Sequence, residues 1–214
     1  MIMIRSTLQH AFAVSVLVPA LGLWGCAAPV PTLEGYTPPP PGARWEQERR
    51  DSGSWGKGVA RVQTTRGQRD WQGEAVVTLQ TPEGTTLMRP DGGWLAMLRG
   101  EQPVVSWSPP LRWDFPLQVG KQWLRHYQAT WHAAGRKVDY EVRQTVQAYE
   151  DVSVPAGTFK AWRIASVDTQ GNDDVYWFDA ERGIFVKLLL RRTASHAQGP
   201  GQREVELLRY QAQP

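Results

Sequence analysis

The chain contains one cysteine and four histidines among its 214 residues. A single thiol cannot form an internal disulfide, and a nucleophilic cysteine needs a histidine beside it in a folded site. His126 and His132 are six residues apart on one predicted strand, which separates them by about 20 Å, so they cannot bind the same metal ion. We therefore expect no metal centre and no cofactor.

The sequence also lacks a strong excess of either charge. It has 24 basic and 21 acidic residues, a formal net charge of +3, and no long basic run. Proteins that bind nucleic acid neutralise many phosphates with clustered lysine and arginine. This composition excludes nucleic acid as the expected partner.

Known catalytic motifs are absent. Ser54-Trp55-Gly56-Lys57 has S-x-x-K spacing, but the S-D-N and K-T-G elements that accompany that nucleophile are missing. The acidic stretch 168–174 does not have the ligand spacing of a calcium loop and is typical of a solvated turn. We expect that the protein is not an enzyme. A hydrolase remains the least favoured alternative, because a site built from distant residues leaves no local pattern.

No apolar run is long enough to span a bilayer as a helix, which takes about 20 residues. The longest run, from Ala11 to Trp24, follows Arg5 and ends at Gly25. A basic start, an apolar middle and a small residue at the end are the three parts of a secretory signal peptide. Residues 1–25 are therefore predicted to direct export.

The only cysteine, Cys26, directly follows this segment. The sequence Leu23-Trp24-Gly25-Cys26 resembles the lipobox of bacterial lipoproteins, although Trp24 stands where that motif has a small residue. The resemblance implies that the Cys26 thiol carries a diacylglycerol and becomes the mature N-terminus. The alternative is a free cysteine in an ordinary signal peptide. Ala27 replaces the aspartate that retains such proteins in the inner membrane, so the resemblance implies lipid anchoring in the cell outer membrane, facing the periplasm.

Proline dominates the next segment, with Pro29, Pro31 and the run Pro38 to Pro41. Proline favours the extended polyproline II conformation. We predict that residues 26–43 are a lipidated tether reaching about 50 Å at most, and that residues 44–214 form a periplasmic domain.

From residue 44 onward, short runs rich in valine, threonine and aromatic residues alternate with turn signals. No stretch keeps a helical period over three turns. The pattern predicts an all-β domain: one antiparallel sheet, strongly curved or an incomplete barrel, with about ten to twelve strands in a β meander and at most one short helix.

Two hairpins can be derived from residue alternation. If 133–136 is a turn, Trp131 pairs with Val138 and Tyr127 with Val142, so that Trp131 lies on the apolar face. The second hairpin, 175–190, is apolar on both faces, as is typical of strands covered on both sides. We expect its second face to be covered by a loop, a short helix near residue 45, or a ligand.

The chain is rich in tryptophan, with eleven residues. Those with apolar strand neighbours are expected to pack in the core, and those near turns and prolines are candidates for a binding rim. The expected core set is Trp71, Trp123, Trp131, Trp162 and Trp177. The candidate binding rim is Trp45, Trp55, Trp94, Trp107 and Trp113.

Two motifs and an aromatic strand carry a resemblance to a known family. Residues 116–123 read P-L-x-V-G-K-x-W, residues 152–159 read V-x-V-P-A-G-T-F, and an aromatic strand at 176–178 precedes Gly183. In this order they resemble an uncharacterised family of bacterial envelope lipoproteins. That family has no accepted catalytic residues, and each motif describes a turn entering a strand.

These observations predict an outer-membrane lipoprotein without catalytic activity. We expect it to be held to the membrane through its N-terminal lipid and to bind an apolar ligand or an envelope protein. The alternative is binding of periplasmic glycan through the rim tryptophans, because aromatic faces stack on sugars.

Overall fold

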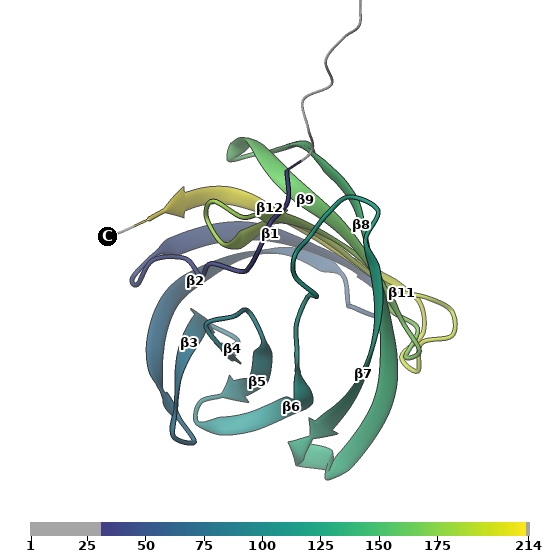
Figure 1. Ribbon diagram of the computed structural model, residues 1–214. Helices are drawn as coiled ribbons and strands as arrows, with labels where there is room; N and C mark the ends of the chain where they lie inside the picture. Colours follow the sequence, from purple (N-terminus) through teal and green to yellow (C-terminus); the bar gives the residue numbers. More distant parts are fainter. Residues whose placement is uncertain (1–30, 213–214) are drawn as a thin grey trace, which may run out of the picture.

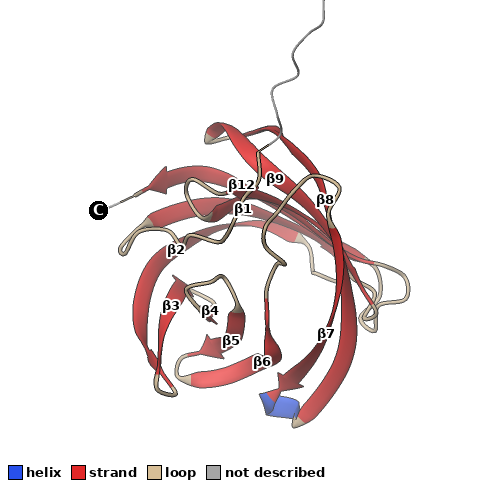
Figure 2. Cartoon of the chain, viewed as in Figure 1, coloured by secondary structure: helices blue, strands red, loops and turns tan. Residues whose placement is uncertain are grey.

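The structure is a computed structural model that describes residues 31–212. It consists almost entirely of strands separated by glycine-containing turns (Figure 2). The strands are β1 (Arg44–Gly53), β2 (Gly58–Trp71), β3 (Glu74–Thr81), β4 (Gly84–Met88), β5 (Trp94–Arg99), β6 (Gln102–Leu111), β7 (Gln122–Trp131), β8 (Arg136–Val154), β9 (Gly157–Asp168), β10 (Asp173–Asp179), β11 (Ile184–Arg192) and β12 (Gly201–Gln211).

Each strand pairs antiparallel with the next one in sequence, and β1 also pairs with β12. This last pairing closes the sheet into a twelve-stranded barrel (Figure 1). The prediction of an all-β antiparallel meander is therefore confirmed, and the sheet is closed. The described residues contain one helical turn, the 3-10 segment His132–Ala134, and it is not near residue 45. No helix in this part of the chain is long and apolar enough to cross a membrane.

Antiparallel order places alternate connections at opposite ends of the barrel. The N-terminal end carries residues 31–43, the end of β12 and the loops 89–93, 112–121 and 180–183. The distal end carries the loops 54–57, 132–135, 169–172 and 193–200. Residue 31, where the described chain begins, thus lies at the N-terminal end of the barrel.

Residues 33–43 do not stand away from the barrel. Leu33 and Leu117 exchange two backbone hydrogen bonds of 3.0 and 2.8 Å, and the Tyr36 ring stacks on Phe178 with ring centroids 5.8 Å apart. Gly183 has a φ of +68°, and a Cβ there would lie 2.3 Å from the Thr37 carbonyl oxygen. The extended tether predicted for residues 26–43 is thus corrected for this part: apolar side chains between the prolines fix it to the fold. Cys26 itself lies outside the described residues.

The β7–β8 hairpin has a different register from the predicted one. Trp131 pairs with Arg136, and Tyr127 with Tyr140, a shift of two residues. The turn is His132–Gly135, closed by Gly135 in the left-handed conformation (φ 58°), one residue earlier than expected. Because side chains alternate with period two, a two-residue shift leaves every side chain on its predicted face.

A loop covers one face of the β10–β11 hairpin, which is one of the three covers considered. A bulge lets Trp177 face Lys187 and Phe178 face Phe185. Phe178 and Phe185 pack against Trp113 and Phe115 from the loop 112–121. Trp45, where a short helix was considered, lies in β1.

The tryptophans assigned to the core divide between buried and exposed positions. Trp162 and Trp123 are buried, with Trp162 only 2% exposed, while Trp71 and Trp177 are half-buried. Trp131 is 43% exposed. Its assignment to the core was wrong, because the apolar face of β7 borders the hollow of the barrel as well as the packed core.

Candidate functional site

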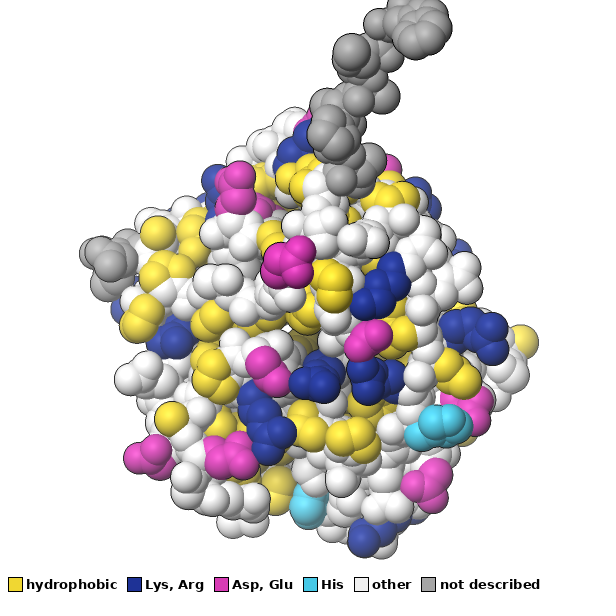
Figure 3. Space-filling model, viewed as in Figure 1, with side chains coloured by type: hydrophobic (Ala, Val, Ile, Leu, Met, Phe, Trp, Pro, Cys, Tyr) yellow, Lys and Arg dark blue, Asp and Glu magenta, His cyan; other side chains and the backbone are white. Residues whose placement is uncertain are grey.

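A cavity of about 760 Å³ occupies the inside of the barrel and extends from the N-terminal to the distal end. This volume lies within the range of about 300 to 1,000 Å³ typical of small-molecule sites. Figure 3 shows hydrophobic side chains in the hollow at the centre of the barrel, with charged side chains around it. Aromatic rings form much of the wall, namely Tyr36, Trp45, Trp55, Trp94, Trp107, Trp113, Phe115, Tyr127, Trp131, Tyr140, Tyr176, Phe178 and Phe185.

All five candidate rim tryptophans line this one cavity. They come from β1, the loop 54–57, β5, β6 and the loop 112–121, so closure of the barrel brings them together. Trp94 and Trp107 meet edge to face, with centroids 6.5 Å apart and planes inclined at 66°. The rings therefore form the inner wall of a cavity, and this pair does not form a flat stacking platform.

Trp113 holds an aromatic cluster at the N-terminal end of the cavity. Its ring meets Phe178 at 4.9 Å and Phe185 at 5.6 Å, in both cases edge to face. Edge-to-face pairs at this separation add about 0.5 to 1.5 kcal/mol beyond their area burial. The cluster therefore fixes the loop 112–121 against β10 and β11.

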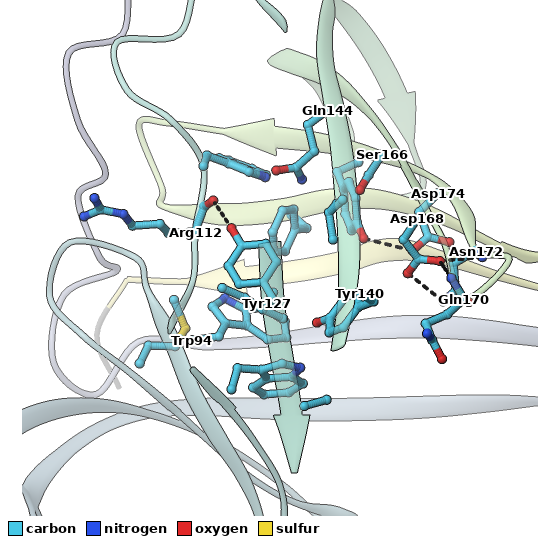
Figure 4. A pocket seen from close by; sticks show the side chains of 18 of the residues that line it. Trp94, Arg112, Tyr127, Tyr140, Gln144, Ser166, Asp168, Gln170, Asn172 and Asp174 are labelled. Atoms are coloured by element: carbon cyan, nitrogen blue, oxygen red, sulfur yellow. Dashed lines mark hydrogen bonds between the residues drawn. The ribbon is translucent and has the colours of Figure 1, made fainter. Parts of the chain in front are cut away.

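One wall of the cavity is polar. Gln144, Ser166 and Asp174 lie side by side across β8, β9 and β10, and the first two are buried (Figure 4). The Tyr176 hydroxyl donates a hydrogen bond of 3.0 Å to Asp174, and the Arg191 backbone N–H donates another. Burial raises the pKa of Asp174 from its ordinary value of 3.8 to about 6. Burial likewise raises the pKa of Tyr140.

Asp168 lies beside this polar wall, but its hydrogen bonds are with its own turn. Its carboxylate accepts hydrogen bonds from the backbone N–H groups of Gln170 and Asn172 and from the Asn172 side-chain amide. These are the bonds of a capped turn, in agreement with the predicted turn for residues 169–172, whereas Asp173 and Asp174 lie in β10. In the range 31–212, no three histidine, cysteine or acidic side chains are grouped so that they could hold a metal ion.

Sequence reasoning missed several residues that contact this space. Tyr127 was assigned by alternation to an apolar face, but alternation cannot distinguish a packed core from a hollow. Asp174 was assigned to a solvated turn, which was wrong, because its burial depends on strands paired through β8 and β9. A Ser106–His132 contact of 2.9 Å was also missed. That pair is exposed, and neither residue lines the cavity.

Comparison with known proteins finds similarity in structure only. No protein-family model matches the chain, and no curated protein matches it in sequence. A candidate exported protein with a YmcC-like fold from Bacteroides fragilis is 12% identical, with a TM-score of 0.47 over 83% of this chain and 99% of that one. A candidate lipoprotein from Parabacteroides distasonis is 11% identical, with a TM-score of 0.44 over 84% and 99% of the two chains. The hypothetical lipoprotein YmcC from Escherichia coli is 12% identical, with a TM-score of 0.37 over 79% and 84%.

Proposed function

We propose that this chain is a lipoprotein of the outer membrane, facing the periplasm, that binds an apolar ligand inside its barrel without catalysing a reaction. The observation that carries the proposal is the aromatic cavity of about 760 Å³. Each CH2 group transferred from water into such a space contributes about 0.8 kcal/mol. A long acyl chain is the class of ligand that gains most from this wall.

The anchoring part of the proposal rests on the sequence and on the path of the chain. Residues 33–43 pack at the N-terminal end, so the lipid at Cys26 would tether the barrel with that end toward the membrane. One acyl chain alone gives marginal binding, and stable anchoring requires a second signal. A diacylglycerol on Cys26 would provide two chains.

The absence of catalysis is proposed from the hydrogen-bond partners of the polar groups. Asp174 and Asp168 accept hydrogen bonds from their own strands and turn. The Ser106–His132 pair would need an orienting carboxylate to act as a nucleophile and base, and no described residue hydrogen-bonds the second ring nitrogen of His132.

Glycan binding is the second candidate, and the polar wall favours it. Gln144, Ser166 and Asp174 could hydrogen-bond hydroxyl groups while Tyr127 and Tyr140 stack on a sugar face (Figure 4). The apolar ligand is preferred because aromatic and aliphatic side chains make up most of the wall.

A charge placed in the cavity should abolish ligand binding. Val138 lines the cavity beside Ala129, its partner on the neighbouring strand β7. An apolar ligand that bound there would have to remove water from an unpaired carboxylate at this position. We expect Val138→Glu to reduce photocrosslinking of a diazirine-bearing hexadecanol by about tenfold or more. The measurement uses the lipidated protein in nanodiscs, with the crosslinked peptides identified by mass spectrometry.

Val167→Glu is the matched control, because Val167 lies on β9, is 44% exposed and does not line the cavity. It should leave the crosslinking yield unchanged. Equal yields from both variants and the unaltered protein would contradict binding in the barrel. Crosslinking that is absent from the unaltered protein, together with saturable binding of soluble peptidoglycan fragments, would favour the glycan candidate.

Lipid attachment has its own test. Cys26→Ala removes the sulfur atom that would carry the diacylglycerol, so the precursor should keep its signal segment and should incorporate no labelled fatty acid. The measurement is metabolic labelling with palmitate, followed by intact-mass analysis of the membrane fraction. A variant that reached the mature mass with label attached would show that Cys26 is not the lipidation site.

A further inference from the structure

The distal end of the cavity contains a tryptophan held between two arginines. The Arg192 guanidinium carbon lies 3.6 Å from the centroid of the Trp55 ring, and that of Arg203 lies 4.1 Å from it. Both Trp55 and Arg192 line the cavity. Cation–π contacts at this distance fix the planes of the guanidinium groups.

The two arginines differ in how their charge is balanced. Arg203 forms two hydrogen bonds with the Asp51 carboxylate, at 2.7 and 2.8 Å. Arg192 donates to the Ser54 carbonyl oxygen at 3.0 Å, and within residues 31–212 it forms no ion pair with a carboxylate. Arg192 therefore presents a positive charge at the cavity wall without a described carboxylate in contact, and so does the exposed Arg136 at the same end.

Unsatisfied hydrogen-bond donors coincide with this charge. The Arg192 Nε–H and the Trp55 Nε1–H are both withdrawn from solvent, and neither has an acceptor in the described part of the chain. A buried donor without an acceptor costs about 1 to 3 kcal/mol. Each of these groups lacks the same kind of partner, an oxygen that accepts hydrogen bonds, and the adjacent charge favours a negative one.

The acidic groups near Arg192 make their hydrogen bonds with other groups, and Asp174 attracts Arg192 electrostatically without contacting it. Asp168 accepts three hydrogen bonds from its own turn, and Asp174 accepts from Tyr176 and Arg191. At the opposite end of the cavity, Arg112 pairs with Asp91 at 3.3 Å. The arginine charge that no described carboxylate contacts thus lies at the distal end, away from the aromatic cluster around Trp113.

We propose that the ligand is an anionic amphiphile, with its carboxylate or phosphate headgroup at Arg192 and Trp55 and its apolar chain directed toward Trp113. This inference rests on the proposed function and adds the class and orientation of the ligand. Charge-assisted hydrogen bonds to a single headgroup should favour an acid over an alcohol of the same chain length by about tenfold or more.

The test compares three diazirine probes with the same sixteen-carbon chain: palmitic acid, hexadecyl phosphate and hexadecanol. With the lipidated protein in nanodiscs at constant pH, both anionic probes should crosslink to cavity peptides at least tenfold more strongly than hexadecanol. Arg192→Gln should lower the yields of both anionic probes to about the yield of hexadecanol.

Arg191→Gln is the matched control, because Arg191 is the adjacent arginine, pairs with Asp173 at 2.8 Å and does not line the cavity. It should retain the preference for anions. Trp55→Phe keeps an aromatic ring against Arg192 but removes the ring N–H, so it should lower the preference for anionic probes about threefold. This second variant tests the inference if Arg192→Gln does not fold.

Each contrary outcome has a separate meaning. Equal yields of acid and alcohol on the unaltered protein would overturn the anionic headgroup and leave apolar binding intact. Displacement of the acid by millimolar inorganic phosphate would overturn the amphiphile, because the site would then be one for free phosphate. Failure of all three probes to crosslink would overturn the proposed function and this inference together.

Discussion

Replacing Trp162 by alanine should lower the free energy of unfolding by about 3 to 5 kcal/mol. Its side chain is 2% exposed, and its ring lies 4.8 Å from that of Tyr149 in a cluster that includes Leu117 and Trp123. Alanine would leave a cavity that the closed sheet cannot collapse to fill, which adds to the lost burial. Urea-induced unfolding followed by circular dichroism measures the change.

Trp131→Ala is the informative comparison. Trp131 also lies in a strand with apolar neighbours, but it is 43% exposed at the cavity wall. Its replacement should cost about 1 kcal/mol or less, since little burial is lost. Equal losses for the two variants would mean that Trp131 packs in the core and not at the cavity wall.

The two tryptophans show what alternation along a strand can and cannot predict. Period-two patterning assigned the faces of β7 and β8 and survived a register error of two residues, because only odd shifts exchange faces. It could not predict the register itself, which depends on Gly135 adopting a left-handed conformation in the turn. Nor could it distinguish a core from a hollow, since an apolar side chain satisfies both.

Closure of the barrel was beyond local reasoning for a different reason. It requires β1 to pair with β12, as in the pair Arg44 and Gln211, and no short motif encodes a contact between the two ends of a domain. The same holds for the candidate headgroup site, where Arg192 and Ser54 are 138 positions apart. The candidate rim tryptophans were identifiable because strand ends and turns surround the openings of a barrel, so aromatic residues there tend to border its interior.

Asp174→Asn should stabilise the protein at neutral and alkaline pH. Burial raises the pKa of this carboxyl group from 3.8 to about 6, so ionisation is less favourable in the folded than in the unfolded chain. The folded state therefore binds more protons between these values, and stability falls as the pH rises through them. A shift of this size corresponds to a loss of about 3 kcal/mol in the free energy of unfolding. The loss is complete above pH 6 and absent below pH 4.

The asparagine variant should match the unaltered protein near pH 4 and exceed it in unfolding free energy by about 2 to 3 kcal/mol at pH 8. Asparagine has nearly the shape of aspartate and can still accept the Arg191 backbone N–H, so packing is preserved. Urea unfolding at several pH values gives the comparison.

Asp173→Asn is the control, because this neighbour pairs with Arg191 at the surface and not in the cavity. A surface ion pair contributes about 1 kcal/mol or less, so this variant should show no gain in stability at pH 8. If Asp174→Asn gave the same stability difference at pH 4 and pH 8, the carboxylate would be as well solvated in the barrel as in the unfolded chain. The polar wall would then be a hydrated surface, and the cavity would be less suited to an apolar chain than its aromatic residues indicate.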